Sequence, residues 1–143
     1  MHCPRRMNPK ALELQARTRQ FANDVIKFCE ALPNDLATQK IVSQLLDSAG
    51  STDSNYRATC RARSTDEFIS KIGVAAEEAD ESKGWLELLV TSGKATIESA
   101  GALIQEADEL TAIFVKSRIT AERNKAERLR FNKQIRSPKG RRR

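Results

Sequence analysis

The sequence has one histidine, one tryptophan and an aromatic content of only 5%. Histidine is the most common general base and metal ligand, and here it occurs only as His2, close to the N-terminus. The sequence contains neither a glycine-rich phosphate-binding loop nor a Ser-His-Asp set. These absences argue against an enzyme, and we expect no catalytic residue, no cofactor and no metal.

Long apolar runs are also missing. No stretch reaches the roughly 18 apolar residues that suggest a membrane-spanning helix. The first ten residues, MHCPRRMNPK, are basic but are not followed by an apolar segment, so we expect no secretory signal. The cysteines are Cys3, Cys29 and Cys60, an odd number without a CxxC pattern, which argues against a disulfide framework or a zinc site. We therefore expect a cytoplasmic protein without a membrane partner.

The residues that are plentiful favour helices. Apolar residues make up 39% of the 143 positions, whereas there are only six glycines and four prolines. Apolar residues recur at steps of three and four in four segments, approximately 9–32, 36–63, 65–91 and 97 onward. Short connections between amphipathic helices predict an all-α fold, an antiparallel up-down-up-down four-helix bundle with a basic C-terminal extension.

The predicted organisation has three parts. Residues 1–8 form a flexible N-terminus, residues 9–124 form the bundle, and residues 125–143 form a basic tail that is partly helical or disordered. Within the second helix, Gly50 carries a cost of about 1 kcal/mol relative to alanine. Either a close helix crossing or a break in the helix would account for it.

The segment NYRATCRARSTDEF, residues 55–68, concentrates cations at the end of the second helix. Arg57 and Arg61 are four residues apart and share a helix face, and Arg63 lies at the helix end. Ser64 and Glu67 then form a capping box that starts the third helix. The arginines could serve the helix dipole or form salt bridges, for example with Asp53. They could also bind phosphate, whose oxygens guanidinium groups match in pairs.

The C-terminal tail is the second basic element. Residues 125–143 hold nine basic residues and one acid, Glu127, whereas residues 1–124 hold sixteen basic and eighteen acidic residues. Blocks of this kind commonly bind nucleic acid through its phosphates, and acidic lipid is the weaker alternative. The candidate phosphate-binding residues in the tail are Lys125, Arg128, Arg130, Lys133 and Arg136.

An acidic run lies in the third helix, at Glu77, Glu78, Asp80 and Glu81, with Trp85 one turn further on. A di-metal site is one interpretation, but bundle sites of that kind use Glu-x-x-His pairs that this chain lacks. We favour a solvated face or a contact with a neighbouring subunit through Glu77, Glu81 and Trp85. Base stacking on Trp85 is disfavoured, because the surrounding acids would repel phosphates.

These features together resemble the four-helix-bundle proteins related to the ribosomal-RNA intervening-sequence protein. The resemblance runs from about Leu14 to Val115, and its most specific parts are Asn55, the Arg63-Ser64 junction before Glu67-Phe68, and the acidic run before Trp85. Many members of this family read Asn-Ile-Ala-Glu-Gly where this chain reads NYRAT at residues 55–59. The departure replaces a carboxylate and adds a positive charge.

The resemblance implies a ring-like homo-oligomer, typically a pentamer, with a basic surface for nucleic acid. Some related bundles are accessory subunits that hold RNA or a reverse transcriptase. We therefore expect a non-enzymatic homo-oligomer that binds RNA or DNA phosphates through a basic surface. The alternative is a protein-interaction scaffold or accessory subunit without nucleic-acid binding.

Overall fold

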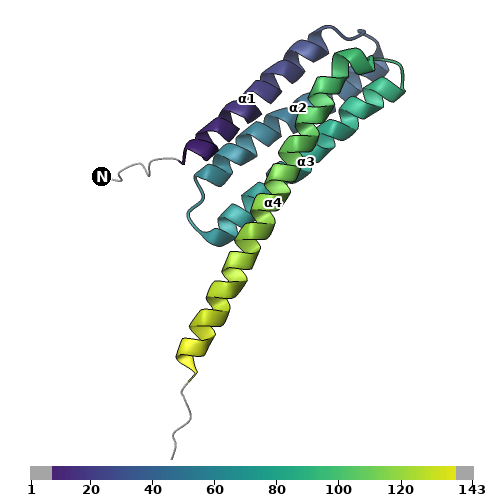
Figure 1. Cartoon of the computed structure of the whole chain (residues 1–143). Helices are drawn as coiled ribbons and strands as arrows, with labels where there is room; N and C mark the ends of the chain where they lie inside the picture. Colours follow the sequence, from purple (N-terminus) through teal and green to yellow (C-terminus); the bar gives the residue numbers. More distant parts are fainter. Residues whose placement is uncertain (1–7, 138–143) are drawn as a thin grey trace, which may run out of the picture.

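Four helices make up the structure, a computed structural model that describes residues 8–137. They are α1 (Pro9–Glu30), α2 (Leu36–Cys60), α3 (Thr65–Thr91) and α4 (Ile97–Arg136). Figure 1 shows them running alternately up and down, with α2 beside α1 and α3, and α4 beside α3 and α1. The predicted all-α four-helix bundle is confirmed.

Each helix starts at a polar capping residue. Asn8, Asp35, Ser64 and Thr96 accept hydrogen bonds from backbone N–H groups in the first turn of the helix that follows. Hydrogen bonds from the backbone and side chain of Thr38 lower the pKa of Asp35 to about 2. At the other end of α3, Gly93 has φ of 78°, which closes the turn into α4. Because each helix is capped at its start, the chain can begin a new helix after only a short connection.

The ends of two helices differ from the sequence-based expectation. Helix α1 ends at Glu30 rather than Leu32, and α2 ends at Cys60 rather than Arg63. Pro33 contributes to the first difference, because it disfavours the helical conformation at Leu32, and the end of α1 closes with hydrogen bonds from the Ala31 and Leu32 N–H groups to the carbonyls of Phe28 and Cys29. Neither explanation for Gly50 holds, since α2 runs through it without a break and no atom of a neighbouring helix would meet a Cβ there within 4 Å.

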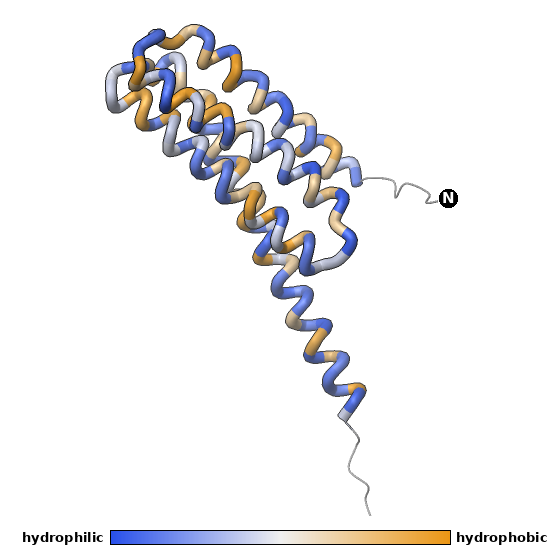
Figure 2. Tube along the Cα trace, turned by 180° about the vertical axis from the view of Figure 1, so that it is seen from behind, coloured by the Kyte–Doolittle hydropathy of each residue, from blue (hydrophilic) through white to orange (hydrophobic). Residues whose placement is uncertain are grey.

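The core follows the predicted inward-facing stripes. Phe21, Leu45, Leu86 and Phe114 are at most 1% exposed, and each comes from a different helix. Figure 2 shows hydrophobic residues recurring between hydrophilic ones along the helices of the bundle. Small polar residues also lie inside: the Ser82 hydroxyl donates to the Ser48 hydroxyl at 2.8 Å and joins α3 to α2. The bundle is therefore packed by aliphatic and aromatic side chains with a few satisfied polar links.

Helix α4 is much longer than the others. Its 40 residues span about 60 Å, against about 40 Å for the 27 residues of α3. Its last buried residue is Phe114, and residues 126–137 are all exposed. Figure 1 shows this part projecting beyond the α2–α3 connection, and we call residues 122–136 the extension. Residues 1–7 and 138–143, which include most of the predicted flexible N-terminus and the end of the basic tail, lie outside the described residues.

No helix within residues 8–137 has a stretch long and apolar enough to cross a bilayer.

Candidate nucleic-acid interface

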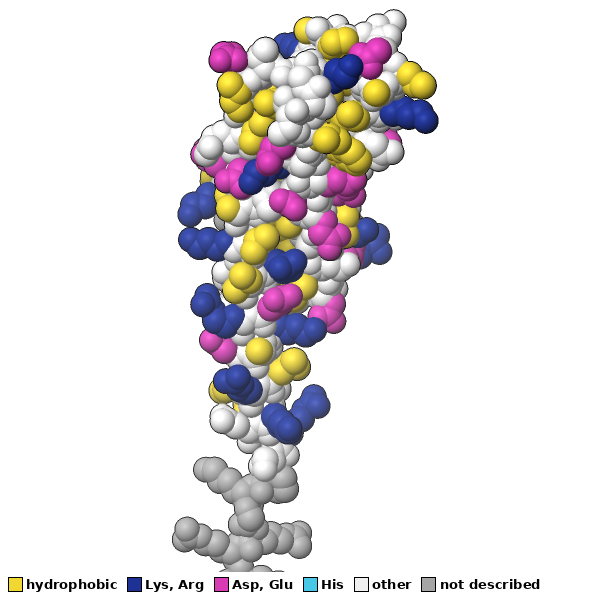
Figure 3. All heavy atoms as spheres, turned by 90° about the vertical axis from the view of Figure 1, so that its right-hand side faces the viewer, with side chains coloured by type: hydrophobic (Ala, Val, Ile, Leu, Met, Phe, Trp, Pro, Cys, Tyr) yellow, Lys and Arg dark blue, Asp and Glu magenta, His cyan; other side chains and the backbone are white. Residues whose placement is uncertain are grey.

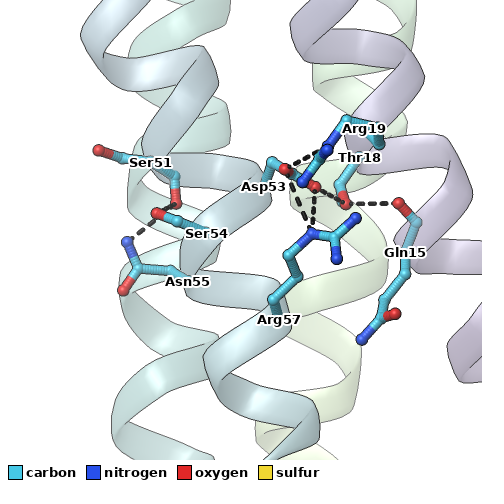
Figure 4. Close-up of polar contacts among 8 residues, drawn as sticks. All are labelled: Gln15, Thr18, Arg19, Ser51, Asp53, Ser54, Asn55 and Arg57. Atoms are coloured by element: carbon cyan, nitrogen blue, oxygen red, sulfur yellow. Dashed lines mark hydrogen bonds and ion pairs between the residues drawn. The ribbon is translucent and has the colours of Figure 1, made fainter.

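A buried carboxylate joins α1 to α2 and binds the first of the predicted arginines. The Asp53 side chain is only 10% exposed, and its Oδ1 accepts a hydrogen bond from the Thr18 hydroxyl at 2.8 Å. The Arg19 Nε donates to Oδ2 at 2.9 Å, and the Arg57 Nε donates to Oδ1 at 3.3 Å. Figure 4 shows both guanidinium groups turned toward this one carboxylate. We call these four residues the Asp53 network.

The network gives Arg57 a structural role. A buried carboxylate without a partner is costly, and Arg57 offsets the charge of Asp53 from within α2. Thr18 and Arg19 bind the same carboxylate from α1 and so hold α1 against α2. The salt bridge to Asp53 was one of the two interpretations open from the sequence. Arg57 remains 33% exposed, and its terminal nitrogens form no hydrogen bond within residues 8–137.

Arg61 and Arg63 lie beyond the last turn of α2 and differ from Arg57. Arg61 is the C-terminal cap of α2, and its backbone N–H donates to the Ala58 carbonyl at 3.1 Å. Arg63 lies in the connection to α3, where its backbone N–H donates to the Glu67 carboxylate at 3.2 Å. Both side chains are exposed, and neither forms an ion pair within the described part of the chain. Their charge is therefore available to a partner.

A groove of about 900 Å³ opens at the same end of the bundle. It lies between the start of α1, the α2–α3 connection and α4, and we call it the end groove. Its cations are Lys10, Arg63, Lys125 and Arg128, and no acidic residue lines it. Two acids lie in the first turn of α3, where Asp66 pairs with Lys125. The Arg128 guanidinium donates to the Thr65 hydroxyl at 3.0 Å. The lining of the groove is thus positively charged.

The floor of the end groove is apolar. Leu14, Phe68 and Ile113 are partly buried and pack against the core. Tyr56 also lines the groove, and its ring stacks on Phe114 with centroids 5.2 Å apart. Burial is the main cause of the raised pKa of Tyr56, and its neighbour Cys60 adds to it, so the phenol stays neutral at physiological pH. A cationic rim over an apolar floor fits a ligand that is both anionic and apolar.

The remaining tail cations lie on the extension. Arg130, Lys133 and Arg136 are exposed and form no ion pair within residues 8–137. Figure 3 shows that toward the tip the acidic side chains give way to lysine and arginine, with hydrophobic side chains between them. Those apolar residues are Leu129, Phe131 and Ile135, each more than half exposed. The structure thus brings Lys125 and Arg128 to the groove and leaves the other three cations beyond it.

The acidic run lies on α3 away from this basic end. Glu77 and Glu81 are exposed, and the Trp85 indole N–H donates to Glu81 at 3.3 Å. Partial burial and the neighbouring carboxylates raise the pKa of Glu78. The described residues contain no group of three or more side chains arranged to hold a metal ion. Trp85 is partly buried at the edge of the core.

Sequence reasoning missed two members of the basic surface. Arg19 enters the Asp53 network from α1, and Lys10 lines the end groove from the first turn of α1. Neither has a local signal, because their partners are more than 30 residues away in sequence. The alignment of α1 with α2 brings them there, and the sequence-only prediction did not extend to the register between helices.

The fold and this surface define a class: an all-α bundle whose cations gather at one open end. Within that class, the chain belongs to the 23S rRNA-intervening sequence protein family, whose sequence model matches residues 10–116. The resemblance carried by Asn55 and the Arg63-Ser64 junction is thereby confirmed. The match ends at residue 116 within α4, before the extension begins at residue 122.

A solved structure shows the same fold. It is a protein of unknown function from the S23 ribosomal protein family of Bacteroides thetaiotaomicron, 27% identical to this chain. The likeness has a TM-score of 0.66 and covers 73% of this chain and 97% of that one. No protein with a curated description matches the chain.

Proposed function

We propose that this protein is a non-enzymatic helical bundle that binds RNA or DNA through phosphate contacts at its basic end. The observation that carries the proposal is the end groove, which has four cations and no acid in its lining. Exposed cations of the extension continue this charge away from the bundle. Lysine and arginine arranged in this way bind phosphates without reading base sequence.

The family adds independent support. Its description names an intervening sequence of 23S rRNA, so an RNA is associated with the family by name. The end groove involves Arg63, Lys10 and Ile113, all within the matched residues 10–116, whereas Lys125 and Arg128 lie outside them. The proposal therefore combines a family region with cations that come from the long α4.

A salt titration tests the proposal. The full chain should bind labelled RNA and DNA at low salt, and the logarithm of the affinity should fall linearly with the logarithm of the salt concentration. A chain that ends at Asn124 should bind more weakly and with a shallower slope, because it lacks the cations of the tail. Absence of binding at low salt, or an affinity that does not change with salt concentration, contradicts the proposal.

We further infer a homo-oligomer, with the family's ring of five as the expected form. The acidic residues Glu77 and Glu81 are exposed and lack an ion pair within the described residues, and so does Arg61. Opposite charges on two faces of one molecule favour a head-to-tail contact, and such a contact gives a ring when the rotation between neighbouring subunits closes. Repetition of the basic end around such a ring would raise the effective affinity for a long nucleic acid.

A charge swap tests this contact. We expect Glu81→Arg and Arg61→Glu each to lower the mass measured by light scattering, and the double variant to restore it. Arg61 is the better partner than Arg57, because Arg57 already binds Asp53. A wild-type chain that is monomeric at all concentrations, or a double variant that stays dissociated, contradicts the contact.

A protein-interaction scaffold is the competing function. The observation in its favour is the extension itself, where Leu129, Phe131 and Ile135 are each more than half exposed. Exposed apolar residues on a helix are typical of a protein-binding face. Substitution of all three by serine separates the functions, since it should leave salt-dependent nucleic-acid binding largely intact and abolish binding to a protein partner.

A further inference from the structure

We propose that the end groove takes unpaired nucleotides of RNA or DNA, with a base over its apolar floor and the flanking phosphates on its basic rim. The inference rests on the proposed nucleic-acid binding and goes further, because it names the form of nucleic acid and the place where a base is held. Electrostatic binding alone would not distinguish a single strand from a duplex.

The arrangement of charge is the first argument. Arg63 approaches the groove from the α2–α3 connection, Lys125 and Arg128 from α4, and Lys10 from α1. Three separate segments of the chain therefore place cations around one opening. Lys125 pairs with Asp66, and Arg128 donates to Thr65, so both side chains lie at the rim beside the start of α3. Arg63 has no side-chain partner within residues 8–137 and remains free to bind a phosphate.

The floor is the second argument. Phosphate alone needs no apolar surface, yet Leu14, Phe68 and Ile113 line the same groove as the cations. Phe68 is only partly buried, so an aromatic ring contributes to this surface. Proteins that bind single strands combine a positive groove with aromatic and apolar side chains on which bases stack. The volume of about 900 Å³ falls within the size range of small-molecule sites.

Only an unpaired base can reach the apolar floor of the end groove. Bases of a duplex are stacked inside it, so an apolar floor behind a basic rim is beyond their reach. An unpaired base can turn away from its backbone and leave its phosphates outside. Asn124 and Ser117 also line the groove and can form hydrogen bonds to an inserted base. A single strand can therefore contact the rim with its phosphates and the floor with a base, whereas a duplex can contact only the rim.

The cations beyond the groove favour a nucleic acid over an acidic peptide. An acidic amphipathic peptide would satisfy the rim and the floor as well. The extension favours the nucleic acid, because Arg130, Lys133 and Arg136 continue beyond the groove as a row of exposed cations for successive phosphates. A short peptide in the groove would leave that row unused.

The experiment fills the groove without changing its charge. Ala121 lines the groove on α4, whereas Ala126 lies on the same helix outside it and is exposed. We would measure fluorescence anisotropy with a labelled strand of about 15 nucleotides that cannot pair with itself, and with its duplex, at constant salt. Wild type should prefer the single strand. Ala121→Phe should weaken single-strand binding about tenfold and change duplex binding less than twofold, whereas Ala126→Phe should change neither.

The outcomes separate the two proposals. Equal binding of strand and duplex by wild type, or single-strand binding that Ala121→Phe leaves unchanged, overturns the groove inference while nucleic-acid binding stands. Failure of wild type to bind either form at low salt overturns both. Tighter binding of an acidic amphipathic peptide, with single strands unable to displace it, also overturns the inference. If Ala121→Phe does not fold, Asn124→Phe fills the groove from an exposed position.

Cys60 provides a readout in the unmodified protein. Its thiol is free, partly exposed and lines the groove, whereas Cys29 is buried. Burial raises the pKa of Cys29 to about 11, which further slows its alkylation. Mass spectrometry of the Cys60 peptide should show that the single strand slows alkylation by a maleimide and that the duplex does not. Equal rates with and without a bound single strand contradict occupation of the groove.

Discussion

Arg57 and Arg63 lie six residues apart in the sequence, yet the fold puts them to opposite uses. Arg57 points toward α1 and binds the buried Asp53, together with Arg19. Arg63 follows the end of α2 and joins Lys125 and Arg128 around an opening without an acidic lining residue. The Asp53 network therefore uses its cations to neutralise a buried carboxylate between α1 and α2, whereas the end groove has no carboxylate of its own to bind its cations.

The difference teaches that an arginine cluster is not a single functional unit. Whether a cation is available depends on what the neighbouring helix brings to it. Helix α1 meets the surface of α2 where Asp53 already provides a carboxylate, and Arg19 adds a second cation to it. At the end of the bundle, α1 and α4 bring further cations to Arg63 instead.

The largest expected effect comes from removing two charges from the end groove, which tests whether its cations serve binding and not stability. Arg63→Gln with Arg128→Gln should weaken nucleic-acid binding about 50-fold at about 0.1 M salt, because two phosphate contacts are lost. The free energy of unfolding should change by less than about 0.5 kcal/mol, since both side chains are exposed. Anisotropy titrations and urea unfolding measure the two quantities.

A matched double variant controls for net charge. Lys27 and Lys40 are exposed and lie near the opposite end of the bundle, at the end of α1 and the start of α2. Lys27→Gln with Lys40→Gln removes the same charge and should weaken binding less than about threefold. Equal losses in the two double variants would mean that overall charge, and not the groove, governs binding.

The second prediction concerns the other side of the comparison. Asp53→Ala should lower the free energy of unfolding by about 2 kcal/mol, because Thr18, Arg19 and Arg57 lose their shared acceptor. The loss stays below that of a fully buried ion pair, since both arginines can turn to water. Asp66→Ala removes an exposed carboxylate that also binds a cation, Lys125, and should cost less than about 0.5 kcal/mol. Urea unfolding measures the loss of unfolding free energy in both variants. Equal losses for Asp53→Ala and Asp66→Ala would contradict the prediction.

The smallest expected effect separates neighbouring arginines. Arg57→Gln should lower the free energy of unfolding by about 1 kcal/mol, since Arg19 remains on Asp53. Arg61→Gln should change it by less than about 0.5 kcal/mol, because only the backbone of Arg61 caps α2. If Arg57→Gln left stability unchanged and weakened nucleic-acid binding as much as the groove variant does, Arg57 would belong with the groove.

Much of this fold could be predicted from local patterns. Steps of three and four in α1 placed Phe21 and Val25 inside, and both are at most 1% exposed. Capping residues located the helix starts, and the Ser64 hydroxyl does accept a hydrogen bond from the Glu67 N–H. These features succeed because each depends on residues within one or two turns of each other.

The surface was less predictable for the opposite reason. The end groove needs the start of α1, the α2–α3 connection and α4 in one place, and the Asp53–Arg19 pair needs the register of α1 against α2. The prediction for Gly50 was wrong. A glycine in a helix suggests a close approach or a break, but Gly50 lies on an exposed face of a continuous helix. Periodicity assigns residues to faces but does not say which faces meet.

Helix α4 has no glycine or proline between Gly101 and Pro138, so nothing in its covalent chain acts as a hinge. The extension then behaves as a stiff arm that sets both the distance and the direction of its cations relative to the groove. One added residue would turn Arg130, Lys133 and Arg136 by about 100° around the helix axis. Seven added residues would move them outward by about 10 Å and restore nearly the same direction. The arm therefore has a phase as well as a length, and a ligand that reaches from the groove to the tip must match both.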